Sequence, residues 1–300
     1  MKNYPLISVI VPFFNSVNDV KKCLDSLFFS TYENIEVVCV DDGSTDETWA
    51  VLKKNFSLYK NFIFLRNKKN RGVAYSRSRA LKHCHGEYVM FCDGDDTFSS
   101  DMISRMFKAL MDNSVDLVVC DTNLVYDDCS KDDLKTSEKA FLMDEGLCGK
   151  MYVNDLVIMK TTRVLWNKLF KKELIDRFNI DFPMFNVAED VAFFLKYLSV
   201  TGSVFFIREK LYNYTRTKDS LINRRFDLGV DAVDDCVKAL ENVLVFMDKN
   251  NIFKNRKIFE VCYENEIKYS IDLMKKLLDE NLKEQQLKID EMKNSQLVQN

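Results

Sequence analysis

The 300-residue sequence contains few of the residues that interrupt regular structure, with only 8 glycines and 3 prolines. This scarcity excludes collagen-like chains, proline-rich linkers and Gly/Ser-rich low-complexity segments. The net charge is also small, because 43 Lys and Arg residues are opposed by 46 Asp and Glu residues, which leaves a formal charge of −3. A surface without a strong positive field does not favour a nucleic acid as partner. We therefore expect a globular, helix-rich protein that binds no nucleic acid.

Three further absences concern the compartment of the protein. The longest apolar stretch, 191–207, is interrupted by Lys196 and by Thr201 to Ser203, and neither part approaches the about 20 residues of a membrane helix. Residues 1–6 lack the apolar core of a secretory signal. The 9 cysteines are odd in number and include no Cys-x-x-Cys pair, which is typical of a reducing compartment. These features predict a cytoplasmic protein.

The first half of the chain alternates short apolar runs with amphipathic stretches. Strands are predicted at 7–12, 35–40, 62–65 and 88–92, and helices at 19–29, 48–56 and 73–84. Strands joined by crossover helices form a mostly parallel, doubly wound sheet with helices on both faces. The predicted fold class is therefore α/β.

The pattern changes after Ser99. We expect a helix at 102–111, a strand at 116–120, an acidic surface loop at 127–139, a helix at 190–198 and a strand at 203–207. Weak periodicity between 143 and 185 predicts irregular structure, and two apolar stripes beyond residue 226 predict long helices. The chain thus divides into segments 1–120, 121–225 and 226–300.

Carboxylates follow directly after two of the predicted strands. One strand runs into Asp41 to Asp46, which reads DDGSTD, and another runs into Asp93 to Asp96, which reads DGDD. Ligands of an open parallel sheet bind at the carboxyl ends of its strands, so the two acidic loops can converge. Oxygen ligands suit hard cations such as Mg²⁺ or Mn²⁺. Ordinary turns or helix caps would explain either loop alone, whereas a metal-bound phosphate ligand explains both.

Four motifs, in this order, resemble those of family 2 glycosyltransferases with the GT-A fold. They are ISVIVPFFN from Ile7, VDDGSTD from Val40, Asn70-Arg71-Gly72 with Arg77, and GEYVMFCDGDD from Gly86. A further segment, WNKLF from Trp166 followed by Ala188-Glu189-Asp190, resembles members that build bacterial surface polysaccharides. The resemblance implies a nucleotide-sugar-binding half at 1–120, an acceptor-binding half at 121–225 and a helical C-terminal extension at 226–300.

The resemblance also implies a metal site. Asp93-Gly94-Asp95 corresponds to the D-x-D element, in which Asp95 binds Mn²⁺ or Mg²⁺ and Asp93 reaches the ribose or the ion. A cation is needed because the departing nucleoside diphosphate gains negative charge. We expect Asp96 to cap the following helix or to orient its neighbours.

The donor nucleotide is expected at the end of the first strand. Asp42, with Asp41 as the second choice, would accept a hydrogen bond from the imide N–H of uracil, and Arg77 would approach the diphosphate or the D-x-D carboxylates. Family members usually have Asn after this arginine, where Ser78 stands here. The remaining residues assigned to nucleotide-sugar binding are Pro12, Phe13, Asn15, Asn70, Gly72 and Gly94.

Asp190 is the candidate general base, taking a proton from the acceptor hydroxyl in a single displacement that inverts the configuration. Glu189 and Trp166 are assigned to acceptor binding, with Trp166 stacking on a sugar face. Tyr212, Tyr214 and Ser220 resemble a family segment that closes over the diphosphate, although a packed polar loop is the simpler interpretation. His83-Cys84-His85 offers no closed set of metal ligands and is interpreted as structural.

The predicted activity is transfer of a sugar from a UDP-sugar to a saccharide or lipid-linked acceptor in synthesis of a surface polysaccharide such as capsule or lipopolysaccharide. One alternative is a non-catalytic nucleotide-binding scaffold of a polysaccharide assembly complex. Another is a sugar nucleotidylyltransferase, although no Gly-rich loop follows the first strand. The C-terminal helices would pack back, form an oligomer, or rest on the inner membrane through Lys249, Lys254, Arg256 and Lys257.

Overall fold

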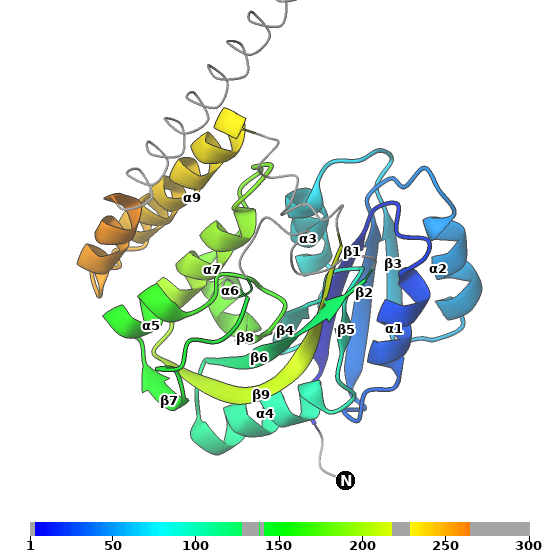
Figure 1. Cartoon of the computed structure of the whole chain (residues 1–300), viewed down its shortest axis with the longest axis horizontal. Helices are drawn as coiled ribbons and strands as arrows, with labels where there is room; N and C mark the ends of the chain where they lie inside the picture. The colour runs from blue at the N-terminus through cyan, green and yellow to red at the C-terminus, as the bar shows by residue number, and fades with distance from the viewer. Residues whose placement is uncertain (1–3, 128–137, 139–140, 218–228, 265–300) are drawn as a thin grey trace, which may run out of the picture.

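The computed structural model describes residues 4–127, 138, 141–217 and 229–264 (Figure 1). Four parallel strands form the first half of a nine-stranded sheet. They are β1 (Ile7–Phe13), β2 (Ile35–Asp41), β3 (Phe62–Arg66) and β4 (Tyr88–Phe91). The complete strand order is β3-β2-β1-β4-β8-β6-β9-β5, with β7 pairing on β9. The α/β fold class and all four predicted strands are confirmed.

Helices cover both faces of this sheet. The helices of the first half are α1 (Val20–Phe28), α2 (Thr48–Phe56), α3 (Val73–Leu81) and α4 (Met102–Asn113). Side chains alternate across a strand, so Val9 and Val11 of β1 pack with α1, α2 and α4, whereas Ile10 packs in the core that contains α3. The sheet is therefore doubly wound, as predicted.

The second half completes the sheet with strands that pair mostly antiparallel, and it adds further helices. These elements are β5 (Thr97–Phe98), β6 (Leu117–Tyr126), β7 (Gly149–Tyr152), α5 (Asp155–Lys160), β8 (Lys168–Lys171), α6 (Lys172–Phe178), α7 (Glu189–Val200) and β9 (Ser203–Arg216). The prediction of irregular structure between 143 and 185 was wrong in part, because β7, α5, β8 and α6 lie there, whereas 161–167 and 179–185 are irregular. The elements there have only 4 to 7 residues, which is too short for a period to emerge.

Strands β6 and β9 are longer than predicted. They pair in parallel from Leu117 and Val204 to Tyr126 and Arg216, with register shifts on either side of Asp121. The exposed residues 208–210 hid the continuation of β9 from the sequence pattern. This long pair carries residues 211–216 to the carboxyl ends of β1 and β4, where the acidic loops lie.

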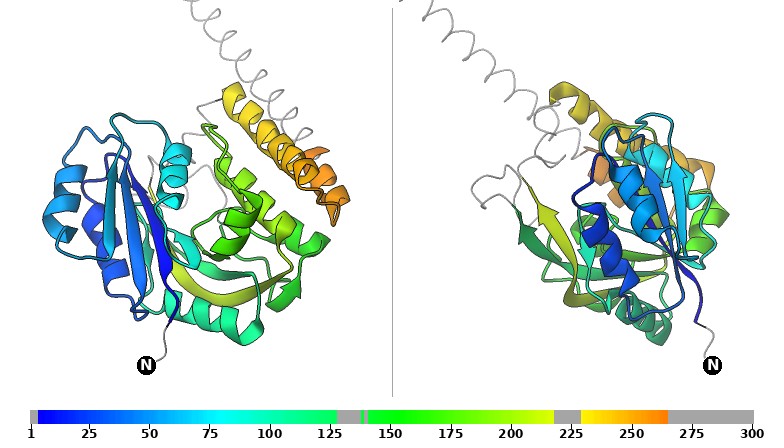
Figure 2. Two further views of the ribbon diagram at one scale, coloured as in Figure 1. Left: turned by 180° about the vertical axis from the view of Figure 1, so that it is seen from behind. Right: turned by 90° about the vertical axis from the view of Figure 1, so that its right-hand side faces the viewer.

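Helix α9 (Gly229–Lys249) lies alongside α7, on the face of the sheet that also holds α3 (Figures 1 and 2). Its buried residues join the core shared with α7, and they are Cys236, Ala239, Leu240, Val243, Phe246 and Met247. Arg256 of the predicted basic cluster is paired with Asp248 and Glu260. Within residues 4–127, 141–217 and 229–264, no helix has the length and apolarity to cross a bilayer. The acidic segment 128–137, Ser220 and the second half of the last apolar stripe lie outside the described residues.

Candidate active site

Polar side chains gather where β1, β2 and β4 end. Because these strands are parallel, the loops after them lie at one edge of the sheet. Asn15 follows β1, Asp41 ends β2 with Asp42 directly after it, and Asp93 to Asp96 follow β4. The structure thus brings together the two acidic loops that the sequence separates.

Arg77 joins the D-x-D loop to the helix that carries the candidate base. Its Nη2 lies 2.7 Å from Oδ1 of Asp93, and its Nη1 lies 2.8 Å from Oε1 of Glu189. The side chain is 7% exposed, and the Coulomb interactions with these carboxylates raise the pKa of Arg77 against the opposing effect of burial. The guanidinium of Arg77 therefore holds two carboxylates in place, Asp93 from the first half of the chain and Glu189 from the second.

The two D-x-D carboxylates, Asp93 and Asp95, lie close enough for the charge of one to act on the other. Burial and the neighbouring charge of Asp93 raise the pKa of Asp95 to about 7. Crowded oxygen ligands of this kind fit a hard divalent cation, which would favour the ionised form. In the part of the chain that the structure describes, no group of three His, Cys, Asp or Glu side chains converges. A cation at Asp93 and Asp95 would thus take its remaining ligands from substrate phosphate and water.

Asp96 is a buried anchor rather than a helix cap. Its Oδ2 accepts a hydrogen bond from the Tyr212 hydroxyl at 2.6 Å, and its Oδ1 accepts one from the Thr215 N–H at 2.6 Å. The Tyr212 oxygen in turn accepts the N–H of Asp93 at 3.2 Å. Burial raises the pKa of Asp96 well above its usual range. The capping interpretation was wrong, and Asp96 instead fastens the D-x-D loop to β9.

Asp42 holds the loop between β3 and α3. One oxygen accepts the side-chain N–H of Asn67 at 2.6 Å, and the other accepts the N–H of Gly72 at 2.8 Å. The N–H of Arg71 approaches both oxygens, at 3.1 and 3.2 Å. The carboxylate is 4% exposed and is engaged by these donors. Asp42 therefore anchors this loop, and its role in reading uracil stays a prediction.

Asn67 completes this anchor and was missed by the sequence analysis. It is 4% exposed and donates to both Asp42 and Ser76. The second choice, Asp41, is fully buried and lies 2.9 Å from Nε of Arg66. A polar residue directly after the third strand was the only signal for Asn67. Asn70, which accepts the N–H of Gly72 at 3.0 Å, lies in the same loop.

The aromatic residue at the end of β1 that faces solvent is Phe14, not Phe13. Phe13 is 2% exposed and packs in the core, and a Cβ on Gly94 would lie 2.6 Å from its ring. Phe13 and Pro12 thus pack against the D-x-D loop, and the nucleotide contact of Phe13 stays a prediction. Phe14 is 43% exposed. The alternation of side chains along a strand would have distinguished the two.

Asn15 joins the loops after β1 and β2. It has a left-handed backbone with φ 50°, a conformation that asparagine tolerates better than most residues. Its N–H donates to the Ser44 hydroxyl at 3.0 Å, and its side-chain oxygen accepts the Thr45 N–H at 2.9 Å. Asn15 therefore shapes the rim of the site beside Phe14.

Glu189 and Asp190 begin α7, where the helix dipole favours carboxylates. Burial and the charge of Asp190 raise the pKa of Glu189 to about 7, against the lowering effect of Arg77. Glu189 is 6% exposed and engaged by Arg77, which fixes the start of α7. Its role in acceptor binding stays a prediction. Asp190 is half-buried and accepts the N–H of Val191 at 2.8 Å.

Trp166 belongs to an aromatic stack. Its ring centroid lies 4.4 Å from that of Tyr212 and 5.2 Å from that of Tyr214, with nearly parallel planes. Trp166 is 4% exposed, and its stacking on an acceptor sugar stays a prediction. The ring supports the two tyrosines of β9. The packed interpretation of Tyr212 and Tyr214 is the one that the structure shows.

Lys168, in the same motif, is fully buried. Its ammonium donates to the carbonyl of Val164 at 2.6 Å and to the side-chain oxygen of Asn167 at 2.8 Å. Burial lowers the pKa of Lys168 to about 7, while the charge of Asp190 acts in the opposite direction. The hydrogen bonds of Lys168 therefore stabilise the loop before β8. Lys168 also interacts electrostatically with Asp190.

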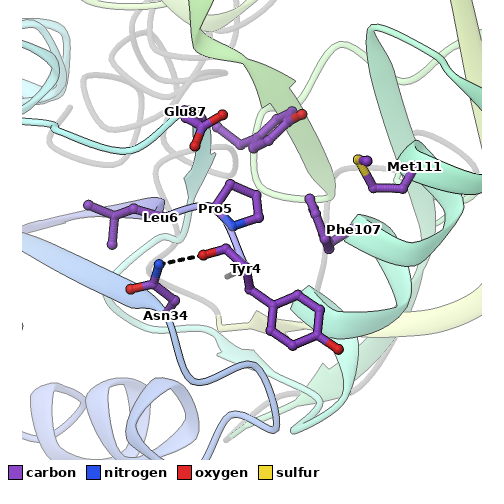
Figure 3. A pocket seen from close by; sticks show the side chains of 8 residues that line it. Tyr4, Pro5, Leu6, Asn34, Glu87, Phe107 and Met111 are labelled. Atoms are coloured by element: carbon purple, nitrogen blue, oxygen red, sulfur yellow. Dashed lines mark hydrogen bonds between the residues drawn. The ribbon is translucent and has the colours of Figure 1, made fainter. Parts of the chain in front are cut away.

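The structural interpretation of His83-Cys84-His85 agrees with the contacts of these residues. His83 and Cys84 bond to carbonyls of α3, and His85 contacts the Glu36 carboxylate at 3.0 Å. A separate pocket of about 360 Å³ lies near Tyr4, Asn34, Glu87 and Phe107 (Figure 3). It adjoins the amino ends of β1, β2 and β4, at the edge opposite the acidic loops. We therefore do not assign the active site to that pocket.

The chain was then compared with known proteins. The family model for glycosyl transferase family 2 matches residues 8–178. The chain is 28% identical over 276 residues to the glycosyltransferase GlyA of Streptococcus pneumoniae, which covers 86% of this chain and 38% of GlyA. It is 25% identical over 262 residues to the poly(ribitol-phosphate) beta-glucosyltransferase of Bacillus spizizenii, covering 84% of this chain and 38% of that protein. The chain thus spans 38% of the length of each of these relatives.

A solved structure shares the fold. The complex of S. aureus TarS residues 1–349 with UDP-GlcNAc superposes with a TM-score of 0.69 at 21% identity, covering 87% of this chain and 72% of that chain. At this identity the likeness shows the GT-A-type fold alone. It agrees with the fold that the acidic loops and the strand order indicate.

Proposed function

This chain belongs to glycosyl transferase family 2, and we propose that it transfers a sugar from a UDP-sugar to a saccharide or lipid-linked acceptor during synthesis of a cell-surface polymer. The observation that carries the proposal is the Arg77 bridge, which joins Asp93 of the D-x-D loop to Glu189, the residue before the candidate base. TarS, which was solved with UDP-GlcNAc, supports a UDP-sugar donor. The relative that glucosylates poly(ribitol phosphate) supports a surface polymer as acceptor.

The donor diphosphate is proposed to lie over the D-x-D loop. Asp95, with Asp93, would hold Mn²⁺ or Mg²⁺, and this cation would stabilise the negative charge of the departing UDP. Gly94 allows this loop to pack closely against Phe13 and Pro12, because the Cβ of any larger residue would collide with them. Arg77 holds Asp93 in place. The carboxylates are thereby held in position before the substrate binds, so the site does not have to reorganise during the reaction.

The nucleoside is proposed to bind at the ends of β1 and β2. Phe14 offers an exposed ring for a flat base, and Asn15 shapes the adjoining loop. The loop anchored on Asp42, which includes Asn70 and Gly72, forms the other side of this site. Asp41, paired with Arg66, supports the floor.

Asp190 is proposed as the general base. Its carboxylate takes the proton of the acceptor hydroxyl while the hydroxyl oxygen attacks the anomeric carbon. The bond from that carbon to the diphosphate oxygen breaks on the opposite side, and the electron pair leaves with UDP. One displacement inverts the anomeric configuration. Asp190 lies next to Glu189 at the start of α7, which is fixed by the contact of Glu189 with Arg77, and this fixed position supports the proposal.

The test is a panel of UDP- and GDP-sugars assayed for hydrolysis and transfer with Mn²⁺, Mg²⁺ or EDTA. We expect Asp95→Asn to lose metal-dependent donor affinity, whereas Asp190→Asn keeps donor binding and loses transfer. Asp101→Asn is the matched control, because Asp101 is an exposed carboxylate that pairs with Arg105. Equal transfer by wild type and Asp190→Asn would reject the base, and metal-independent binding of UDP would reject the cation. Nucleotide binding without turnover of any sugar would favour a scaffold.

A further inference from the structure

The C-terminal helix contacts the loop that leads to the candidate base. On α9, Oδ2 of Asp235 accepts hydrogen bonds from the N–H of Asn186 at 2.9 Å and from the N–H of Val187 at 3.3 Å. Only Ala188 and Glu189 separate these two amides from Asp190. One carboxylate oxygen therefore fixes the backbone immediately before the start of α7.

This backbone has a conformation that needs support. Ala188 adopts φ 62° and ψ 15°, in the left-handed region, which residues with a Cβ disfavour. Such residues persist where their surroundings determine the conformation from several sides. Ala188 is 7% exposed and lies between the two amides bound by Asp235 and the Glu189 side chain bound by Arg77. The turn into α7 is thus held from both sides.

Helix α9 is a firm support for this contact. It lies alongside α7 (Figure 2), and the side chains of Leu240, Val243 and Met247 are buried in the core that α7 shares. Lys196 of α7 bonds to Asp181 at 2.7 Å, and its ammonium lies 5.8 Å from the centre of the Phe246 ring of α9. The position of Asp235 is therefore set by the same packing that sets α7.

We propose that Asp235 is a positioning residue for the acceptor-side base: through the amides of Asn186 and Val187 it fixes the turn that directs Asp190 toward the acceptor hydroxyl. The inference rests on the proposed function, because it takes Asp190 as the base. It gives the C-terminal helical extension a part in the reaction although α9 contributes no group that touches substrate. A base displaced by about 1 Å can lose about 100-fold in rate.

The experiment compares three variants in the full chain. Asp235→Ala removes the acceptor, and we expect kcat of transfer to fall by about 10- to 100-fold with donor affinity unchanged. Asp235→Asn keeps a side-chain oxygen that can accept both amides, so we expect kcat within about threefold of wild type. Asp234→Ala is the control, because the neighbouring Asp234 is exposed and pairs with Lys238 on the same helix.

Amide hydrogen exchange supplies a readout that does not depend on activity. In Asp235→Ala, the amides of Asn186 and Val187 should exchange about tenfold faster or more, whereas amides in the middle of α7 should not change. A change confined to two amides distinguishes lost positioning from general unfolding. Asp235→Ser, which is too short to reach both amides, is the second variant if the alanine variant fails to fold, and the same changes are expected of it.

The outcomes separate the two proposals. Transfer at the wild-type rate by Asp235→Ala would overturn the positioning role, whether or not the two amides exchange faster. An equal loss of kcat in Asp235→Asn and Asp235→Ala would also overturn it, because the amide oxygen should substitute. Activity in Asp190→Asn would instead reject the base assignment of the proposed function, and unprotected amides in the wild type would reject the contact itself.

Discussion

Nη1 of Arg77 lies 2.8 Å from Oε1 of Glu189, and this contact joins residues that are 112 positions apart in the chain. The other end of the guanidinium binds Asp93 at 2.7 Å. A planar fork of donors can hold two carboxylates in fixed directions, which the point charge of a lysine cannot do. The donor-side and acceptor-side loops are therefore set relative to each other by one side chain.

Replacing this fork is predicted to lower both the rate of transfer and the stability of the fold. Arg77→Lys should lose one charged hydrogen bond, which costs about 1.5–3 kcal/mol, and should lower the transfer rate by about 100-fold because Asp93 and Glu189 are no longer held together. Urea unfolding and a transfer assay measure the two effects. Arg177→Lys, at an exposed arginine of α6, should change neither. A rate of Arg77→Lys within a few-fold of wild type would contradict the bridging role.

Two glycines with positive φ allow a matched comparison at the nucleotide loops. A Cβ on Gly43 (φ 73°) would lie 2.4 Å from the backbone of Lys69, whereas a Cβ on Gly72 (φ 85°) would meet nothing within 4 Å. Gly72 has φ 85° and ψ 160°, a region that is essentially restricted to glycine, so Gly72→Ala should cost about 1–3 kcal/mol of backbone strain. Gly43→Ala adds a backbone collision and should cost about 2–5 kcal/mol. Thermal unfolding measures both, and titration with UDP should show the larger loss of affinity for Gly43→Ala.

Much of this fold was predictable because its elements are periodic and its carboxylates follow the strands. The predicted positions of α1, α2 and β1 to β4 agree with the structure to within a few residues, and the two acidic loops lie together as parallel strands require. The short elements between 149 and 178 were not predictable, because 4 to 7 residues carry too little pattern.

The roles of individual site residues were harder to predict than their location. Asp42 and Trp166 lie near the site, but hydrogen bonds from Gly72 and stacking on Tyr212 occupy them. Such partners come from loops distant in sequence, and a motif states only which residues are near. Phe13, the last residue of β1, packs in the core, whereas Phe14 is exposed, a difference that the alternation of side chains along a strand indicates.

The anchor of the D-x-D loop is predicted to contribute to stability as a coupled pair. Asp96→Ala leaves the Tyr212 hydroxyl and the Thr215 N–H without their buried acceptor, at a cost of about 2–5 kcal/mol, and Tyr212→Phe should cost about 1–2 kcal/mol. The double variant should be less destabilised than the sum by about 0.5–3 kcal/mol. Denaturant unfolding of the four proteins measures this coupling. Asp101→Ala, at an exposed carboxylate, should cost at most about 1 kcal/mol, and additive losses would reject the anchor.

Lys168 is predicted to make stability depend on pH in the alkaline range. Burial lowers its pKa from 10.5 to about 7, so between these values the unfolded chain binds a proton that the folded chain lacks. Raising the pH through this window therefore stabilises the folded state, by up to about 1.4 kcal/mol per pH unit. The free energy of unfolding of the wild type, measured in urea, should accordingly rise between pH 7 and 9 relative to that of Lys168→Met. Val164→Ala, in the same loop without a titratable group, should be destabilised equally at each pH. A pH-independent difference for Lys168→Met would mean that the hydrogen bonds to Val164 and Asn167 keep the buried ammonium charged.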